Sequence, residues 1–458
     1  MQLSQTTKAV KVFFVYLDIN NTQPVGYQVG LGYVSAMTKA HGHMTKYVSP
    51  QTEEEIAHLM YEIKKELPDV IAFSVISTQY KYVKRIAKEI KTFYNPKIIC
   101  GGVHPTISPE IIEESIHIDA IVRGEGEYPF SEYLDLLQRG EGYQHVENFW
   151  IREESSIIKN PIRPLIRNLD LLPLPDRENT DFQNMLNKTG FCSFVFSRGC
   201  PFDCTYCCNS VFNEIYGTNL VRFRSVGKAL EEIDDVLMKY RVKYLNFDDD
   251  NFTLNKEWFF GFINRYKKMT KKKFFCNARV GTCTFDMLKA LKDANCIGLL
   301  IGVESGDTEF RRLYLNRSMT NHQIKETFEM AHRAGLKTYS FNIVGFPYET
   351  PERFEKTIEL NAQIYPNTPF LVIFYPYPKT HLRKLCEENN LLVASDLEEF
   401  VERERDEPVV CNPNFSKDEI MFYYKNFRYL VLKRVSIFRA IFFKARQQLK
   451  QLLQIIKT

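Results

Sequence analysis

The sequence predicts an α/β protein in which an N-terminal doubly wound domain is followed by a partial (β/α)6 barrel and a helical C-terminal segment. Two series of short apolar runs alternate with helical patterns, which is typical of parallel sheets covered by helices. A proline-rich stretch separates the two series. At 458 residues the chain is also too long for one ordinary core. The expected parts are the doubly wound domain over residues 1–145, a linker over 146–185, the barrel over 186–385 and the C-terminal segment over 386–458.

The first series favours a parallel doubly wound sheet. Apolar runs predict strands at residues 10–17, 70–75, 97–100 and 118–122, and helical patterns follow near residue 31 and over 80–93. Glycine-rich segments follow three of these strands, at 20–32, 101–105 and 124–127. In such sheets ligands bind beyond the carboxyl ends of the strands. Glycine there leaves bare backbone that can approach a flat or phosphate-bearing ligand.

Residues 147–176 are expected to form an irregular connector, because four prolines interrupt them. The second series then predicts six strands, at 193–197, 244–248, 273–278, 298–304, 337–344 and 370–374. Helices are predicted at 226–240, 255–268, 285–294, 321–334 and 351–364, with a capping box formed by Thr320 and Gln323. Six βα units are too few for a closed eight-stranded barrel. An open partial barrel is therefore expected, with its chemistry at the carboxyl ends of the strands.

Composition narrows the class of protein. A net charge of +4 is small for this length and does not favour a nucleic-acid partner. Eleven cysteines in an otherwise ordinary composition do not indicate a disulfide scaffold, and without a secretory leader they predict a reducing, cytoplasmic setting. No uninterrupted run of 18 apolar residues occurs, so no membrane span is expected.

Three cysteines share one short loop in the run Arg198-Gly-Cys-Pro-Phe-Asp-Cys-Thr-Tyr-Cys. Cys200, Cys204 and Cys207 form a C-x3-C-x2-C triplet, and soft thiolates can hold three corners of a [4Fe–4S] cluster. The fourth iron is then open to chelation by a small molecule. The alternatives are a zinc knuckle or buried thiols, but zinc sites normally take four ligands from paired motifs, and no second paired motif follows. Cys208 breaks the spacing and is expected to be a bystander.

This spacing, with an aromatic residue before the last cysteine, resembles the signature of radical S-adenosylmethionine (SAM) enzymes. The resemblance implies that SAM chelates the open iron and is cleaved reductively to methionine and a 5′-deoxyadenosyl radical, with Tyr206 beside the adenine. It also implies an external electron donor such as flavodoxin or ferredoxin. The six βα units match the open barrel of these enzymes, in which the cluster loop follows the first strand.

The same resemblance indicates SAM-binding residues at later strand ends. Asp249 and Asp250 follow the second strand, where acidic side chains suit the methionine ammonium group; the alternative is a solvated turn that caps the next helix. Glu304 ends the fourth strand and would accept from ribose hydroxyls or the amine. Arg317 would pair with the SAM carboxylate, unless it is a surface arginine. Gly345 would let the loop after the fifth strand pass close to adenine, or would only end the strand.

The N-terminal motifs together resemble the cobalamin-binding domain, flavodoxin-like in fold, that precedes many radical SAM barrels. The resemblance implies that cobalamin is bound by Gly26, Gly30, Ser74, Ser77, Gly101, Gly102, His104, Gly124, Glu125 and Gly126. An alternative role for His104 is that of a histidine in a turn, where its ring forms a hydrogen bond with the backbone. The alternative for the whole domain is a plain flavodoxin-like unit with another ligand or none.

The loop after the first strand lacks the Asp-x-His-x-x-Gly motif that supplies a histidine to cobalt in methionine-synthase-like domains. His41 and His43 come after the first helix, too late for that role. Cobalamin is therefore expected to bind without a histidine on its lower face.

The C-terminal tail combines basic and apolar residues. From Ile420 onward there are nine Lys or Arg and no Asp or Glu, with apolar residues at helical spacings. A basic amphipathic helix is typical of proteins that bind the membrane surface, so peripheral contact with anionic lipid is one expectation. The other is a helix that packs against the barrel and has a positive outer face.

Residues 1 to about 385 thus resemble a cobalamin-dependent (class B) radical SAM enzyme, and many members of this family are methyltransferases. The implied function is transfer of a methyl group from methylcobalamin to an unactivated carbon after hydrogen abstraction by the 5′-deoxyadenosyl radical. One alternative is a non-methylating cyclase, oxidase or rearrangement enzyme with the same cofactors. A second is a cobalamin-binding sensor or carrier whose cluster loop is only structural. The expected substrate is a small or lipid-like molecule.

Overall fold

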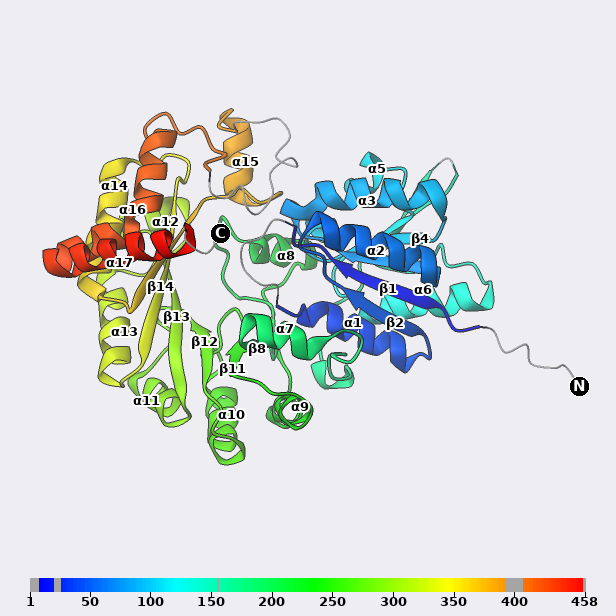
Figure 1. The fold of residues 1–458 in the computed structure, drawn as a ribbon, viewed down its shortest axis with the longest axis horizontal. Coiled ribbons are helices and arrows are strands. Elements are labelled where there is room, and N and C mark those ends of the chain that lie inside the picture. Colours follow the sequence, from blue (N-terminus) through cyan, green and yellow to red (C-terminus); the bar gives the residue numbers. More distant parts are fainter. Residues whose placement is uncertain (1–7, 20–25, 155, 393–406, 456–458) are drawn as a thin grey trace, which may run out of the picture.

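The computed structural model describes residues 8–19, 26–154, 156–392 and 407–455. The first part of the glycine-rich loop predicted at 20–32 lies outside the described residues, as do the side chains of the tail beyond Arg446. Figure 1 shows two α/β units, the first in blue and cyan and the second in green and yellow, followed by helices in orange and red. The predicted α/β organisation is confirmed.

The N-terminal unit is a seven-stranded sheet in the order β2-β1-β3-β4-β5-β6-β7. Its first five strands are parallel: β1 (Lys11–Tyr16), β2 (Met44–Val48), β3 (Val70–Ser74), β4 (Lys97–Gly101) and β5 (Ala120–Val122). The spatial order 2-1-3-4-5 is that of flavodoxin-like sheets, in which ligands bind where the strand order reverses, between β1 and β3.

Helices cover both faces of this sheet, so its strands are apolar on both sides. Phe13 and Val15 of β1 face the core under α2 (Glu53–Glu66) and α3 (Tyr80–Phe93), whereas Phe14 and Tyr16 face the core under α6 (Glu127–Arg139). α1 (Val29–Ala40) lies beside α6. The 3-10 turn η1 (Ser77–Gln79) follows β3, and the short helices α4 (Val103–Ile107) and α5 (Ile111–Glu114) follow β4.

The prediction of an irregular connector from residue 147 was wrong over its first part. β6 (Phe149–Arg152) pairs antiparallel with β5, and β7 (Ile157–Lys159) pairs antiparallel with β6. Both strands are short and precede the first of the four prolines. β6 pairs with β5, about thirty residues earlier, and β7 pairs only with β6, so the apolar pattern of the segment alone does not reveal either strand.

The second unit is a six-stranded parallel sheet in the order β8-β11-β12-β13-β14-β15, which confirms the partial barrel. The strands are β8 (Phe191–Phe194), β11 (Tyr244–Phe247), β12 (Phe274–Ala278), β13 (Cys296–Glu304), β14 (Lys337–Val344) and β15 (Thr368–Ile373). The helices that cover it are α9 (Val226–Lys239), α10 (Lys256–Met269), α11 (Phe285–Asp293), α13 (Asn321–Arg333) and α14 (Pro351–Ile364). The predicted capping box of Thr320 and Gln323 is present.

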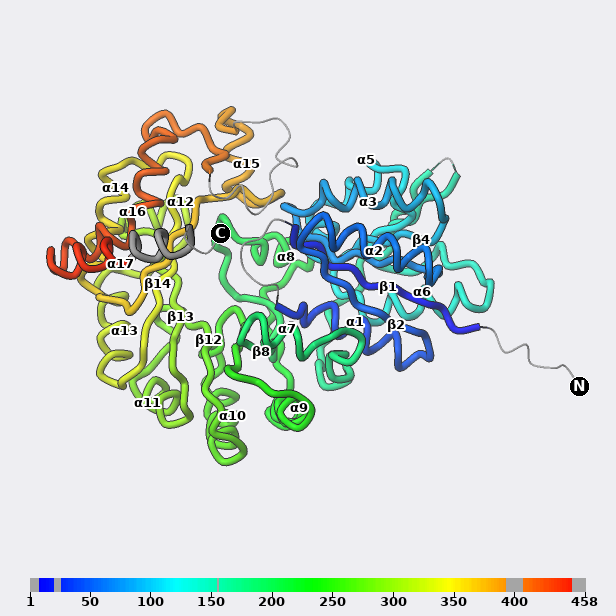
Figure 2. The backbone as a smooth tube through the Cα atoms, in the orientation of Figure 1, coloured from blue at the N-terminus to red at the C-terminus, as the bar shows by residue number. Residues whose placement is uncertain are grey.

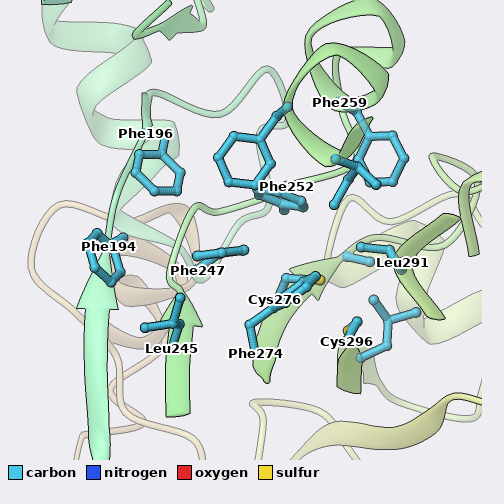
Figure 3. Close-up of a cluster of buried hydrophobic side chains, with 14 of the residues drawn as sticks. Phe194, Phe196, Leu245, Phe247, Phe252, Phe259, Phe274, Cys276, Leu291 and Cys296 are labelled. Carbon is cyan, nitrogen blue, oxygen red and sulfur yellow. The ribbon is translucent and has the colours of Figure 1, made fainter. Parts of the chain in front are cut away.

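Aromatic side chains fill the core between sheet and helices. Figure 3 shows Phe194, Phe247 and Phe274 from the strands pointing toward Phe252 and Phe259. The remaining elements of the unit are α7 (Phe182–Thr189), β9 (Ser197–Arg198), α8 (Cys208–Tyr216), β10 (Arg222–Phe223), α12 (Thr308–Tyr314) and α15 (His381–Glu388). β9 and β10 form a separate antiparallel pair.

The C-terminal segment forms two helices, α16 (Lys417–Val435) and α17 (Ile437–Ile455), visible as the orange and red turns of the tube in Figure 2. α16 packs on the barrel, because Ile420, Phe427 and Val431 are buried against Phe354 and Ile358 of α14. No helix in the described ranges is both long enough and apolar enough to cross a membrane.

Candidate functional site

The three predicted cluster cysteines lie on the loop between β9 and α8, after the first barrel strand. Gly199 has a φ of 92°, and a Cβ there would lie 2.5 Å from the carbonyl oxygen of Leu220, so the loop requires glycine. The side-chain amide of Asn213 donates to the carbonyl oxygen of Cys200 at 3.0 Å. Cys207 is the N-cap of α8, so one thiol lies at a helix N-terminus, which favours negative charge.

Two arginines approach the buried thiol of Cys204. Arg279 Nη1 lies 3.5 Å from Cys204 Sγ, and Arg317 Nη1 lies 4.0 Å from it. The guanidinium of Arg279 also lies over the ring of Phe202, 3.8 Å from its centroid. Cations at these distances suit the negative charge of a thiolate-bound cluster.

Tyr206, Glu304 and Arg317 form one buried group at the end of β13. Arg317 Nη1 donates to the Tyr206 hydroxyl at 3.1 Å and lies 3.4 Å from Glu304 Oε1. Burial raises the pKa of Glu304, and Arg317 opposes this shift. Glu304 has a φ of 68°, a conformation that costs a non-glycine residue about 1–3 kcal/mol and is concentrated at functional sites. Arg317 is 5 % exposed, so the alternative of a surface arginine is wrong.

The two aspartates after β11 that were predicted to bind SAM, Asp249 and Asp250, have different surroundings. Asp249 is buried, and its Oδ1 accepts from the N–H groups of Phe196 and Ser197 at 3.0 and 2.5 Å. Burial nevertheless raises the pKa of Asp249 to about 7. Its Oδ2 has no hydrogen-bond partner within the described ranges. Asp249 therefore holds the chain that enters the cysteine loop, while Asp250 lies at the surface and accepts from the Asn209 side chain at 3.0 Å.

Gly345 follows β14 and has a φ of 84°, which favours glycine. Its N–H donates to Glu349 Oε2 at 2.8 Å, and burial raises the pKa of Glu349 to about 8. A Cβ on Gly345 would lie 3.3 Å from the Ile420 side chain of α16. The next residue, Phe346, contacts Tyr206 edge to face, with ring centroids 5.9 Å apart. The loop thus reaches the Tyr206 group through Phe346, while the Cβ position of Gly345 faces α16.

A cavity of about 370 Å³ lies at the carboxyl ends of β1, β3, β4 and β5. Seven predicted cobalamin residues line it: Gly30, Ser74, Gly101, Gly102, Gly124, Glu125 and Gly126. A Cβ on Gly102 would lie 3.1 Å from the backbone nitrogen of Val75, so the cavity wall has no room for a side chain there. Most other lining residues, such as Phe14 and Phe130, are apolar. A cavity of this size and lining fits the aromatic base of a nucleotide tail such as that of cobalamin.

The other three predicted cobalamin residues lie elsewhere. Ser77 Oγ and His104 Nδ1 are 3.0 Å apart and line a second cavity of about 430 Å³, whose opposite wall includes Lys379 and Arg383. Gly26 lines neither of these two cavities.

His41 and His43 bind a helix residue away from both cavities. His41 Nδ1 lies 2.7 Å from one carboxylate oxygen of Asp135 in α6, and His43 Nε2 lies 3.0 Å from the other. Both histidines therefore join the C-terminal end of α1 and the start of β2 to α6.

A partly buried arginine joins the two units. Arg198, two residues before Cys200, donates to Glu125 Oε1 at 2.9 Å and to Glu127 Oε1 at 2.5 Å. Arg222 also donates to Glu125 at 2.9 Å. Glu127 lines the 370 Å³ cavity, and its buried Oε2 has no hydrogen-bond partner within the described part of the chain. We call these four side chains the interdomain clasp. It connects the glycine-rich loop after β5 to the start of the cysteine loop.

Four residues of this region were missed by sequence reasoning: Arg198, Arg222, Arg279 and Glu127. Arg279 directly follows β12, so its place at a strand end was a usable signal. Arg198 and Glu127 lie inside the two motifs that were recognised. Their pairing joins positions 71 residues apart, which no local pattern reveals.

The fold and the site together define a radical SAM enzyme with a cobalamin-binding domain. Residues 17–134 match the B12 binding domain, and residues 194–360 match the Radical SAM superfamily. The structure of the radical SAM methyltransferase TsrM from Kitasatospora setae, with cobalamin and a [4Fe–4S] cluster bound, has the same fold, with a TM-score of 0.70 and 13 % identity over 85 % of this chain and 76 % of TsrM.

Two curated relatives are similar over most of this chain. The uncharacterized methyltransferase PH0819 of Pyrococcus horikoshii is 30 % identical over 404 residues, 86 % of this chain and 85 % of the relative. The anaerobic magnesium-protoporphyrin IX monomethyl ester cyclase of Cereibacter sphaeroides is 25 % identical over 352 residues, 74 % of this chain and 55 % of the cyclase. The chain therefore belongs to the cobalamin-dependent radical SAM methyltransferase family, and its cofactors are a [4Fe–4S] cluster, SAM and cobalamin.

Removing one carboxylate of the interdomain clasp should destabilise the protein far more than removing a surface carboxylate. Glu127→Ala removes a buried carboxylate and leaves Arg198, whose side chain is 19 % exposed, with one partner fewer. Breaking a fully buried pair typically costs about 3–5 kcal/mol, and a loss toward the lower end of this range is expected. Glu132→Ala, on the same helix, breaks a partly exposed pair with Arg163 and should cost at most about 1 kcal/mol. Urea unfolding of both variants measures the difference, and equal losses would contradict a structural role for the clasp.

Proposed function

We propose that this enzyme transfers a methyl group to an unactivated carbon of a small-molecule substrate, with Cys200, Cys204 and Cys207 as the ligands of the [4Fe–4S] cluster. The observation that carries the proposal is the interdomain clasp. It holds the cysteine loop beside the glycine-rich loop of the cavity, so one substrate can lie within reach of both cofactors. When bound, the cofactors supply a 5′-deoxyadenosyl radical and a transferable methyl group.

The residues around Cys204 are suited to bind SAM. Arg317 would pair with the SAM carboxylate, Glu304 would accept from the ribose or the amine, and Tyr206 would pack beside the adenine. The open Oδ2 of Asp249 is a further acceptor for the amine, with Asp250 beside it. Gly345 would let the loop after β14 approach the adenine. Arg279, already 3.5 Å from Cys204 Sγ, would balance cluster charge.

The residues of the first cavity are suited to bind cobalamin. Gly30, Ser74, Gly101, Gly102, Gly124, Glu125 and Gly126 would contact the nucleotide tail and the edge of the corrin. Ser77 and His104 would contact the ring from the neighbouring cavity, and Gly26 would contact it from the first loop. No histidine would serve as a cobalt ligand. Closure of the two units around the substrate would keep water from the radical.

The reduction of the cluster would require an external one-electron donor such as flavodoxin or ferredoxin. We further propose a cytoplasmic enzyme with peripheral contact to a membrane through α17. Ile437, Phe438, Ile441 and Phe442 are 47, 82, 57 and 71 % exposed. Arg439 lies exposed between them and Lys444 lies exposed just after them, and this combination suits an anionic lipid surface.

Changing the three cysteines together to alanine should remove the cluster. The anaerobically reconstituted wild type should contain four iron and four sulfide ions per chain, as one [4Fe–4S] cluster, with visible thiolate-to-iron absorbance. Cys208→Ala is the matched control, since it removes a neighbouring thiol outside the triplet. If the triple variant keeps its iron and still cleaves SAM, the proposed ligands are wrong.

Methyl transfer should consume SAM in two ways. Each methylated product should appear with one S-adenosylhomocysteine and one 5′-deoxyadenosine, and SAM labelled with CD3 should transfer its label. Glu304→Ala should lower both SAM-derived products while cobalamin binding is retained. A cyclase, such as the relative from Cereibacter sphaeroides, would form 5′-deoxyadenosine without matched S-adenosylhomocysteine. Turnover without label transfer would therefore contradict methylation and support the cyclase alternative.

Vesicle sedimentation tests the membrane contact. Wild-type protein should sediment with vesicles that contain phosphatidylglycerol and less with phosphatidylcholine alone, and added salt should weaken binding. The double variant Phe438→Ser/Phe442→Ser should lose most of this binding. Phe422→Ser, which changes an aromatic residue 54 % exposed on α16, is the control. Equal sedimentation of all three proteins would contradict the proposal.

A further inference from the structure

The concave face of the barrel sheet, opposite the covering helices, is partly open. Along β14, Tyr339 and Phe341 are partly exposed, while the intervening Thr338, Ser340 and Asn342 are buried. Side chains alternate between the two faces of a strand. The buried set faces the helices, as Figure 3 shows for Phe247 and Cys276. The exposed set therefore lies on the concave face.

Six aromatic rings cross this face from one edge of the sheet to the other. Phe191 of β8 and Phe370 of β15 are 40 and 42 % exposed. Ring centroids are separated by 5.7, 6.1, 6.0, 6.0 and 5.3 Å along the series Phe191, Tyr244, Phe275, Tyr339, Phe370 and Phe341. We call this series the aromatic row. Every strand except β13 contributes to it.

β13 contributes Gly298, which lets the row continue. A Cβ at this position would lie 2.5 Å from Cδ1 of Phe275 and 2.7 Å from Cε2 of Tyr339. The φ of Gly298 is not positive, so the glycine provides space and not a special backbone conformation. Glycine inside a strand weakens it and often marks a close approach of another group. Here the two neighbouring rings take up that space.

The aromatic row belongs to the same surface as the SAM-binding end of the barrel. Gly302 lies on the same side of β13 as Gly298, and its carbonyl oxygen accepts from Arg317 Nη2 at 2.6 Å. Four residues of strand separate the two glycines, a distance of about 13 Å. Leu300 between them, with Val372 of β15 at 40 % exposure, continues the apolar surface.

The rings do not form a platform for a flat ligand. The ring planes meet at 82° between Tyr244 and Phe275 and at 60° between Phe275 and Tyr339, whereas Phe370 lies nearly parallel to Tyr339 and Phe341, at 21° and 18°. A ligand that spans the row therefore meets rings of different orientation. A flexible chain can follow such a surface, whereas a planar macrocycle cannot stack on it. Exposed Lys273 and Lys337 lie two positions before Phe275 and Tyr339, and by strand alternation they face the same side. They would suit an anionic group at the far end of the chain.

We propose that the aromatic row binds the apolar chain of the substrate, an elongated amphiphile with an anionic head group, whose reacting carbon lies at the SAM end of the barrel. The proposal rests on the proposed function for the identity of that end. The chain then runs from the carboxyl ends of the strands toward their amino ends. Its anionic group lies near Lys273 and Lys337.

Binding of cis-parinaric acid, a fluorescent acyl carboxylate, tests this proposal on the full-length protein without cofactors. Wild type should bind one molecule with enhanced fluorescence, and palmitate should displace it better than octanoate. Phe370→Ser should weaken binding of the probe at least fivefold. Gly298→Val should also weaken it at least fivefold, because the valine side chain would fill the space between Phe275 and Tyr339. Phe438→Ser on α17 is the control and should leave binding unchanged.

Circular dichroism identifies any loss of fold in Gly298→Val, and Phe370→Ser changes a partly exposed edge residue that folding should tolerate. Three results would each overturn the proposal. The first is equal affinity of wild type and Phe370→Ser for the probe, and the second is weaker binding in Phe438→Ser alone. The third is tighter binding of protoporphyrin than of the acyl probe. Because the assay needs no cofactor, its failure leaves the label-transfer test of methylation untouched. Failure of label transfer with intact acyl binding would overturn methylation and retain the acyl site.

Discussion

The arrangement of the two units depends on the guanidinium of Arg198, which is largely removed from water. A charge taken out of water is costly unless it is paired, and here one arginine holds carboxylates of Glu125 and Glu127 from the other unit. Because Arg198 precedes Cys200 by two residues, this pairing also sets the position of the cysteine loop against the first cavity. A carbon radical is too reactive to travel, so chemistry that uses both cofactors requires such a rigid junction.

Charge is distributed unevenly along the barrel. Arg279 and Arg317 lie at the carboxyl ends of the strands beside Cys204, where anionic sulfur and a zwitterionic cofactor would bind. Farther from this end the concave face becomes aromatic. An aromatic surface with Lys273 and Lys337 at its far end would orient an amphiphile, because the apolar chain is favoured along the rings and the anionic group beside the lysines. Gly298 and Gly302 of β13 have no side chains, so neither position projects a side chain into the path between the two ends of the barrel.

Local sequence patterns were sufficient to predict most of the helices and strands. The α3 helix and the strands β13 and β14 were expected within two residues of their observed bounds, because each has a strong apolar period and clear ends. β6 and β7 were missed because a short antiparallel edge strand depends on its partner and has little pattern of its own. The tail was expected as one helix, but Ser436, with a φ of −163°, separates α16 from α17.

The sequence by itself determined the class of the protein and the loop that carries the three proposed cluster ligands, because those cysteines lie within eight residues and their spacing is visible in one dimension. The family resemblance also indicated Glu304, the last residue of β13, and Arg317 beyond it. Only the tertiary structure decided which oxygens and cations meet. Glu125 pairs with arginines, His104 with Ser77, and Arg279 with Cys204. These contacts join strand ends that are distant along the chain, and a parallel sheet brings such ends to one edge only after it has folded.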